Sequence, residues 1–226
     1  MPEIHTLDAL RDRCPVFRDR AEAGRVLAGM LEELRGSDLV MLAVPAGGVP
    51  VAAPIARTLG LPLDVAVVSK ITLPWTSEAG YGAVAFDGTV LLDEALVARL
   101  GLDEATTQRG IERTLEKVRS RQRSFRGGRE APDLSRRTVL VVDDGLASGI
   151  TLRAAVAALR RAGAAQIIIA IPTGSARAVA LLAPLVDALY CANVRGGQSF
   201  AVADAYEHWS DVSEAEAAAM LSHVRG

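Results

Sequence analysis

The residues best suited to chemistry lie between positions 138 and 151, where two carboxylates, Asp143 and Asp144, precede a loop of small residues. A loop of this kind that opens a helix presents free backbone N–H groups and the positive end of the helix dipole, so it suits a phosphate. The hydroxyls of Ser148 and Thr151 add further donors. Because the carboxylates would repel a bare phosphate, the ligand should also carry hydroxyl groups. A phosphorylated sugar satisfies both demands.

Two elements must hold these residues in place. Residues 138–142 form an apolar run rich in β-branched side chains, which predicts a strand buried on both faces of a parallel sheet. Residues 150–162 predict a helix that ends at Gly163. Ligands of open α/β sheets bind at the carboxyl ends of strands, where the acidic pair falls. The plainer alternative is an Asp-Gly turn with a helix cap, but an acidic pair between a buried strand and such a loop is uncommon.

This stretch resembles the phosphoribosyl pyrophosphate (PRPP) motif of type I phosphoribosyltransferases, in which an apolar strand, an acidic pair and a small-residue loop ending in Gly-x-Thr follow one another. The resemblance implies an α/β fold, with an open, mainly parallel sheet, flanking helices and a small hood. It implies that the two carboxylates bind the ribose hydroxyls and that residues 146–151 cradle the 5-phosphate. The PRPP-binding residues expected on this basis are Asp143, Asp144, Gly145, Leu146, Ala147, Ser148, Gly149 and Thr151.

A second strand, loop and helix follow the same plan at residues 39–44, 45–48 and 49–59. Gly47 and Gly48 permit backbone conformations that turn N–H groups toward an anion. In the family this position is the pyrophosphate loop, and Ala46 stands where an arginine is common. The next predicted strand, residues 63–70, ends in Lys70, a compact positive charge suited to pyrophosphate or to the base.

Residues 71–82 are too polar for a core, and residues 82–92 predict a hairpin with its turn at Asp87 and Gly88. The resemblance implies that this segment covers PRPP during the reaction, and covers of this kind exclude water. Hypoxanthine–guanine enzymes carry an aspartate where this chain has Ala147, so a 6-oxopurine acceptor is disfavoured. Glu78 is the candidate replacement acid or base. Together with Asp143 and Asp144 it completes the expected catalytic set.

The remaining elements are predicted from periodicity. Residues 18–34, 93–100 and 103–125 predict helices, residues 166–171 and 186–192 predict strands, and residues 172–175 predict a loop before a helix to about residue 182. Residues 1–17 predict irregular structure. The arginine-rich run from 119 to 129 is interpreted as a solvated face or a subunit contact, which leaves a homodimer open. Alternating strands and helices indicate parallel pairing with right-handed crossovers.

Six of the nine aromatic residues fall in two short segments, at 75–86 and 200–209. Two interpretations are open: stacking surfaces for a planar acceptor, or packing of the two segments against each other as a small cap. On the first interpretation, Phe200, Trp75 and Tyr206 are the expected acceptor-binding residues. The resemblance further suggests that Asp204 approaches the magnesium and pyrophosphate.

The 226 residues predict a single domain spanning 1–226, with a core at about 18–192 and a hood from about 71–92 and 193–226. A net charge of −2 argues against a general nucleic-acid binder. Two cysteines form no metal-like spacing, and no apolar segment is long enough for a membrane span, so we expect a cytoplasmic protein without membrane or nucleic-acid partners.

Across residues 18–215 the chain is similar to an uncharacterised group of prokaryotic phosphoribosyltransferases. The resemblance implies a Mg²⁺-dependent transfer from PRPP to a nitrogenous, aromatic acceptor in nucleotide metabolism, with PRPP and the acceptor as small-molecule substrates. The alternative is a PRPP-binding regulator on the same fold without transferase activity. A different nucleotide-binding enzyme lacks support, because the chain has no Walker loop, no nucleophile elbow and no Rossmann glycine motif.

Overall fold

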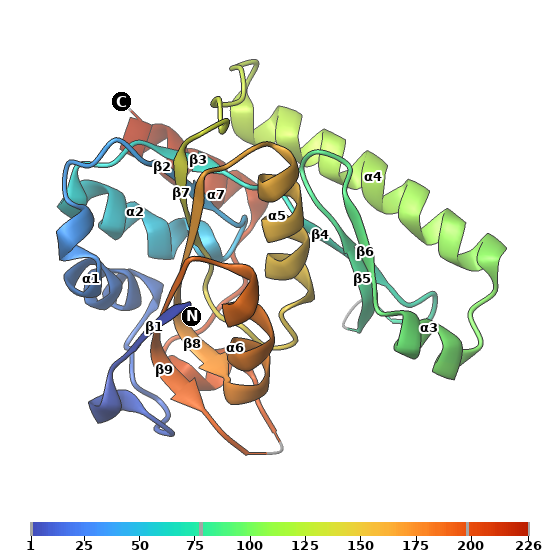
Figure 1. Ribbon diagram of the computed structural model, residues 1–226, viewed down its shortest axis with the longest axis horizontal. Coiled ribbons are helices and arrows are strands. Elements are labelled where there is room, and N and C mark those ends of the chain that lie inside the picture. The colour runs from blue at the N-terminus through green and yellow to red at the C-terminus, as the bar shows by residue number, and fades with distance from the viewer. Residues whose placement is uncertain (1, 77–78, 198, 226) are drawn as a thin grey trace.

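Strand β7 (Thr138–Val142) lies inside a six-stranded sheet of the computed structural model, which describes residues 2–76, 79–197 and 199–225 (Figure 1). The strand order is β1-β9-β8-β7-β2-β3, and every neighbouring pair is parallel. The other strands are β1 (Glu3–Thr6), β2 (Val40–Ala43), β3 (Leu63–Val65), β8 (Gln166–Ser175) and β9 (Ala188–Arg195). The predicted α/β class with an open parallel sheet is confirmed.

Strand β7 is buried on both faces because its residues alternate between two apolar clusters. Val139 and Val141 pack into one cluster, and Leu140 and Val142 pack into the other. This alternation follows the two-residue period of a strand. A strand with apolar residues on both faces is typical of a parallel sheet covered by helices.

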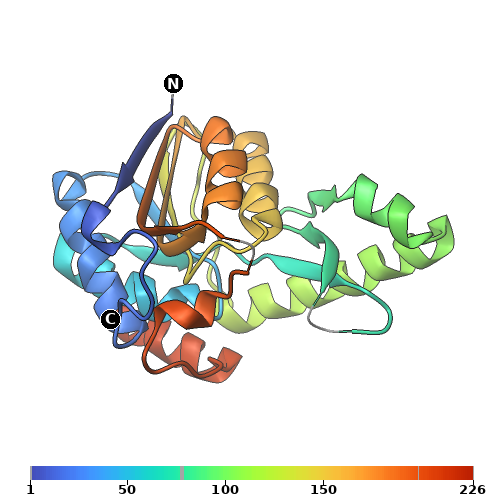
Figure 2. The ribbon, with the colours of Figure 1, turned by 90° about the horizontal axis from the view of Figure 1, so that it is seen from below.

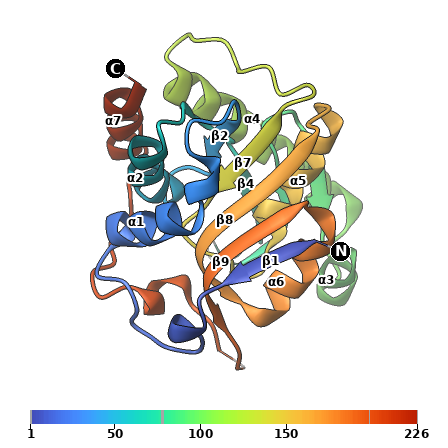
Figure 3. The ribbon, with the colours of Figure 1, turned by 60° about the vertical axis from the view of Figure 1, so that its left-hand side comes forward.

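Helices cover both faces of the sheet, as the view in Figure 2 shows. On one face lie α1 (Arg20–Met30), α2 (Gly48–Leu59) and α7 (Glu214–Arg225), and on the other lie α5 (Ile150–Arg161) and α6 (Ala176–Leu182). Figure 3 shows α1 and α2 beside β2, with α7 outside α2. Within the described residues, four short 3-10 helices complete this part: Asp8–Leu10, Glu32–Leu34, Ala183–Leu185 and Val202–Ala205.

A three-stranded antiparallel sheet projects from the main sheet with two helices of its own (Figure 1). Its elements are β4 (Ser69–Thr72), β5 (Gly80–Val84), β6 (Val90–Leu92), α3 (Glu94–Leu100) and α4 (Glu104–Arg126). The predicted hairpin is confirmed, because Val84 pairs with Val90 across a turn in which Gly88 has a φ of +87°. A positive φ favours glycine, which has no Cβ.

Three predictions of secondary structure were wrong, and Ile71, Leu73 and Tyr81 belong to the core although residues 71–82 looked too polar for it. Residues 63–70 are two strands in different sheets, because both halves are apolar and nothing in the sequence marks the change of sheet. Residues 3–6 are not irregular but add β1 to the sheet edge, where exposure weakens any apolar pattern. The predicted loop at 172–175 continues β8. Pro172 is tolerated there because β7 ends opposite Ala170, so no ladder hydrogen bond to β7 is lost.

Within the described residues, the structure contains no helix that combines the length and the apolar character needed to cross a membrane.

Candidate active site

The acidic pair stands at the carboxyl end of β7, at the start of the loop that leads into α5. Asp143 is buried, and one of its carboxylate oxygens accepts a hydrogen bond from the backbone N–H of Asp144 over 2.9 Å. The loop is tied to β8, because Leu146 donates to the carbonyl of Thr173 and accepts from the N–H of Ser175. These contacts fix the loop in front of the first turn of α5.

The loop after β2 packs directly onto the acidic pair. A Cβ at Gly47 would overlap the carboxylate of Asp144, and a Cβ at Gly48 would lie 2.7 Å from the carbonyl oxygen of Val142. Real Cβ atoms do not approach other atoms this closely, so a side chain at residue 48 would clash with backbone, and one at residue 47 would displace the Asp144 carboxylate or the loop. The two glycines therefore bring the two strand-end loops into contact.

The loop after β2, the acidic pair and Thr151 of α5 line one cleft with a volume of about 440 Å³, whereas residues 145–149 are not among its lining. It gathers six of the residues singled out from the sequence: Ala46, Gly47, Lys70, Asp143, Asp144 and Thr151. Lys117 and Arg121 of α4 and Glu214 of α7 line it as well. The cleft therefore combines carboxylates, a hydroxyl, cationic side chains and two backbone loops at the carboxyl end of the sheet.

Burial sets the electrostatics of the acidic pair. Burial and the neighbouring charge of Asp144 raise the pKa of Asp143 well above its usual range. Burial also raises the pKa of Asp144, while the guanidinium of Arg20 opposes that shift. Arg20 donates through Nε to Oδ2 of Asp144 over 2.9 Å, and its side chain is 9 % exposed. The pair therefore shares one buried cation.

The segment after β9 holds Arg20 and the acidic loop in place. Tyr206 is buried, and its hydroxyl donates to the carbonyl oxygen of Asp144 over 2.7 Å. The guanidinium carbon of Arg20 lies 3.7 Å from the centroid of the Trp209 ring, and Nη1 donates to the carbonyl of Ser210 over 2.8 Å. This C-terminal segment thus positions the acidic pair, directly through Tyr206 and indirectly through Arg20.

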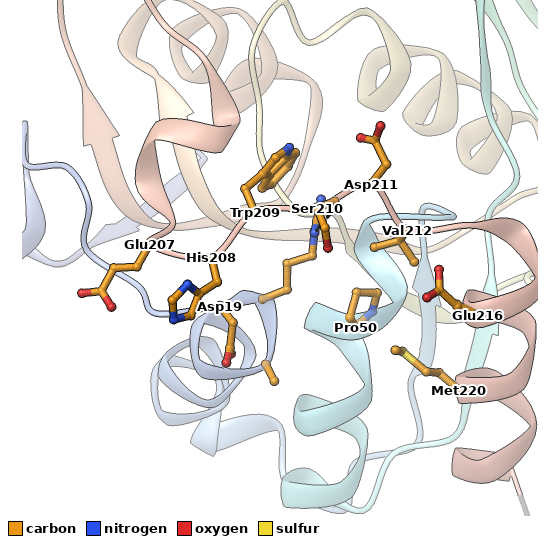
Figure 4. Close-up of a pocket in the computed structure, with 12 residues that line it drawn as sticks. Asp19, Pro50, Glu207, His208, Trp209, Ser210, Asp211, Val212, Glu216 and Met220 are labelled. Carbon is orange, nitrogen blue, oxygen red and sulfur yellow. Dashed lines mark hydrogen bonds between the residues drawn. The ribbon is translucent and has the colours of Figure 1, made fainter.

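A neighbouring groove of about 540 Å³ lies between the starts of α1 and α2 and the C-terminal segment (Figure 4). Trp209, Asp211 and Met220 are among its lining residues, and it shares Val212 with the cleft. Arg20 lines this groove while donating to Asp144, so the Arg20–Asp144 pair lies between groove and cleft.

The expected acceptor and metal residues do not gather in the cleft. Trp75 is exposed in a separate cavity of about 590 Å³ beside α3 and α4. Phe200 lies under the guanidinium of Arg195, which also forms an ion pair with Asp204 at 3.1 Å. Tyr206 contacts Phe17, Trp209 and Arg20 with its ring, which does not fit stacking on an acceptor. Glu78 lies outside the described residues.

The aromatic residues thus pack within separate neighbourhoods rather than as one cap. Tyr206 and Trp209 contact each other and the start of α1, whereas Trp75 lines a cavity with Tyr81 and the turn between α3 and α4. Among the residues that the structure describes, no aromatic pair joins the 75–86 segment to the 200–209 segment.

Sequence reasoning missed Arg20 and Arg121. Arg20 is separated from Asp144 by 124 residues, and Arg121 from Pro45 by 76 residues, so no local pattern links the partners. The interpretation of the run from 119 to 129 as a solvated face or a subunit contact does not hold for Arg121, whose side chain is only 11 % exposed. Arg121 follows Lys117 by one helical turn, and this spacing is the sequence signal that could have placed the two side chains together at the cleft.

The donor set of the cleft fits Mg²⁺ that arrives with a phosphorylated ligand. Mg²⁺ is usually held by one or two carboxylates together with substrate phosphates. Asp143 and Asp144 are the carboxylates in place for this, and both line the cleft. In the described part of the chain, no group of three or more His, Cys, Asp or Glu side chains gathers into a metal-binding arrangement.

Comparison with known proteins identifies relatives for most of the chain. The family model described as the phosphoribosyl transferase domain matches residues 19–178. A curated Mycobacterium tuberculosis protein, named "Putative phosphoribosyl transferase Rv0571c", is 37% identical over 209 residues, which is 92% of this chain and 47% of the relative. The same match is found for its counterpart in a second strain. This chain therefore spans about half the length of these relatives.

A solved structure shows the same fold. The crystal structure of TT1426 from Thermus thermophilus superposes with a TM-score of 0.75 at 32% sequence identity, covering 93% of this chain and all of that one. The agreement extends over the main sheet and the projecting part, because nearly the whole of both chains is covered.

Proposed function

This chain belongs to the phosphoribosyl transferase family, and we propose that it moves the 5-phosphoribosyl group of PRPP to a nitrogenous, aromatic acceptor with release of pyrophosphate. One observation carries the proposal. The acidic pair and Thr151 at the start of α5 line a single cleft with the double-glycine loop, which lies about 100 residues earlier in the sequence.

Each part of PRPP has a counterpart in the cleft or next to it. The carboxylates of Asp143 and Asp144 accept hydrogen bonds from the ribose 2- and 3-hydroxyls. The 5-phosphate binds at the loop 145–149, where the first turn of α5 offers N–H groups without helical partners, together with the hydroxyls of Ser148 and Thr151. The pyrophosphate faces Ala46, Gly47 and Lys70 of the cleft lining, with Gly48 next in the same loop.

The reaction exchanges one bond at carbon 1 of the ribose. The bond from carbon 1 to the pyrophosphate oxygen breaks, and that oxygen keeps the electron pair. The acceptor nitrogen supplies the pair for the new bond to carbon 1 and loses its proton to a base, for which Glu78 is the candidate. Holding the sugar at its hydroxyls and phosphate fixes carbon 1 for the attack. Bound Mg²⁺ would neutralise charge on the pyrophosphate, and Asp143 and Asp144 are the residues that would hold it.

The acceptor must reach carbon 1 from the open side of the cleft. Ala147 supplies no carboxylate to the loop, so the loop does not assist a 6-oxopurine. Trp75 exposes its ring on the projecting part, and Phe200 lies under the guanidinium of Arg195 in the segment after β9, so these two rings are the candidates for stacking on an aromatic acceptor.

A second candidate function rests on Ala46. The pyrophosphate loop carries no charged side chain, which favours a protein that binds PRPP as a signal without transferring its phosphoribosyl group. The two functions share the cleft and differ in product formation alone.

A pyrophosphate-release screen distinguishes these functions. The protein is mixed with PRPP and Mg²⁺ and then with purines, pyrimidines, pyridine carboxylates and small amines. We expect release with one aromatic class and none with the Asp144→Asn variant. Tight PRPP binding without release for any acceptor would support the regulatory function instead. Absence of PRPP binding would overturn both.

A further inference from the structure

Arg121 connects the projecting part of the molecule to the loop after β2. Its guanidinium makes four hydrogen bonds: Nη2 to the carbonyl of Pro45 over 3.0 Å, Nη1 to the carbonyl of Val68 and to the Ser69 hydroxyl over 3.1 Å each, and Nε to Glu214 over 2.7 Å. The side chain comes from α4, yet it ends at the cleft. A guanidinium is therefore anchored beside the backbone of the double-glycine loop.

Arg121 is placed to supply the positive charge that the side chain of Ala46 lacks. A pyrophosphate group needs cationic partners, and the side chain at residue 46 provides none. Lys70, Lys117 and Arg121 all line the same cleft. Lys117 lies one helical turn before Arg121 on α4, so both side chains project from the same face of that helix.

Glu214 is the anion that neutralises Arg121 in this structure. Its carboxylate contacts Nε of Arg121 at 2.7 Å and is 47% exposed. Glu214 opens α7, whose first turn is fixed by reciprocal hydrogen bonds between Ser213 and Glu216. The carboxylate is thus held at the mouth of the cleft by an ordered helix start.

Building on the proposed function, we propose that Arg121 and Lys117 bind the pyrophosphate group of PRPP in place of an arginine at residue 46, and that Glu214 competes with that group for Arg121. A guanidinium has five N–H donors, and the described residues occupy four in Arg121. The fifth donor and the Nε–H that Glu214 now occupies can both turn to phosphate oxygens. The exchange replaces one anion with another, so the charge of Arg121 stays paired.

The competition has a consequence for α7. When a phosphate oxygen takes the place of Glu214, α7 loses its ion pair with α4. Because Glu214 is 47% exposed, its ion pair with Arg121 contributes little stability. The first turn of α7 should therefore stay folded when this ion pair is lost.

Titration calorimetry with three ligands tests this inference: PRPP with Mg²⁺, pyrophosphate with Mg²⁺, and ribose 5-phosphate, which lacks the pyrophosphate. Removing the competing carboxylate in Glu214→Gln should tighten PRPP and pyrophosphate binding by about two- to fivefold. Arg121→Gln should weaken both by about tenfold or more, since a charge-assisted hydrogen bond is lost. Lys117→Gln should weaken both by a smaller factor. Ribose 5-phosphate binding should change in none of these variants.

Arg119→Gln is the matched control, because it removes the same charge from an exposed position on the same helix. It should leave all three affinities unchanged. If Arg121→Gln does not fold, Glu214→Gln alone decides the question. Equal PRPP affinity in Glu214→Gln and the wild type would overturn the competition. An Arg121→Gln effect as large on ribose 5-phosphate as on PRPP would overturn the assignment of Arg121 to pyrophosphate. A wild type that binds no PRPP would overturn the proposed function itself.

Discussion

Arg20, the first residue of α1, donates through Nε to Oδ2 of Asp144 over 2.9 Å, although 124 residues separate them in the chain. Arg20 also stacks on Trp209 and donates to the carbonyl of Ser210. One side chain thus joins the first helix, the acidic pair and the C-terminal segment. We regard Arg20 as a positioning residue that acts on the ligand through Asp144.

Replacing Arg20 by Gln should leave the Asp144 carboxylate without its cation. Removing one partner of a mostly buried pair costs about 3 kcal/mol in the free energy of unfolding. The pKa of Asp144 should rise further, so its carboxylate should become protonated at a higher pH than in the wild type. As the pH is lowered, PRPP binding should therefore be lost at a higher pH in the variant. Calorimetric titrations at several pH values measure this shift. Arg18→Gln is the control, because Arg18 forms an exposed ion pair two residues earlier, and an unchanged pH profile in Arg20→Gln would contradict the positioning role.

Gly47→Ala tests the contact between the two strand-end loops. The added Cβ would overlap the Asp144 carboxylate, so either the loop or the carboxylate must move. We expect PRPP affinity to drop by about tenfold or more, because a displacement of about 1 Å at a binding site can have effects of that size. Gly29→Ala is the matched control, since a Cβ at that helical position has no neighbour within 4 Å. Equal affinities in the two variants would show that the loops do not position each other.

Tyr206→Phe removes a single hydroxyl, the one that donates to the carbonyl of Asp144 over 2.7 Å. Loss of a hydrogen bond of this kind costs about 1 kcal/mol in the free energy of unfolding. The ring contacts with Phe17 and Trp209 remain, so the fold should be kept. We expect weaker PRPP binding with no change in acceptor preference, measured by comparing acceptors at saturating PRPP. A change of acceptor preference would instead favour the stacking role predicted for Tyr206 from the sequence.

The raised pKa of Asp143 has a consequence for stability. Between the ordinary pKa of an aspartate and the raised value in the fold, the native state binds a proton that the unfolded state has released. The contribution of Asp143 to stability therefore falls as the pH rises through that window. Asp143→Asn removes this contribution and keeps an oxygen that can accept from the N–H of Asp144.

We therefore expect Asp143→Asn to melt at a higher temperature than the wild type near neutral pH, with a smaller difference in acid. Asp144 and Arg20, the charged neighbours of the site, and the neutral hydroxyl of Tyr206 are present in both proteins, so the difference reports the loss of the Asp143 carboxyl from the acidic pair. Thermal melts at about pH 5 and pH 8 measure it. A difference in Tm that shrinks as the pH rises would contradict this prediction. PRPP binding should be lost in the variant at every pH.

The parts of the site that could be predicted from the sequence are those that depend on neighbouring residues. Strand β7, the acidic pair and the loop into α5 form one continuous pattern, as do β2 and the double-glycine loop. Their meeting at one edge follows from parallel pairing, which places strand carboxyl ends together. The contacts of Arg20 and Arg121 could not be predicted, because they depend on how α1 and α4 pack against loops far away in the chain.

The differences between the local sequence patterns and the structure have a common physical cause. The run at 63–70 is apolar over most of its length, yet β3 belongs to the main sheet and β4 to the projecting one, and hydrophobicity does not report which sheet a strand joins. The sequence groups Tyr206 with the aromatic residues of a loop-like segment, but Tyr206 is buried against Phe17 and holds the acidic loop. In both cases the tertiary partner, rather than the local pattern, determines the role of the residue.

The central claim is that the acidic pair binds the ribose of PRPP, and PRPP titration into the wild type and Asp144→Asn tests it most directly. Asparagine keeps an oxygen for Arg20, so the variant should fold, and thermal melts check that it does. We predict measurable binding of PRPP with Mg²⁺ by the wild type and a loss of about tenfold or more in the variant, since a hydrogen bond to a charged group is weakened. Equal PRPP affinity in the two folded proteins would contradict the assignment of Asp144 and, with it, the proposed site.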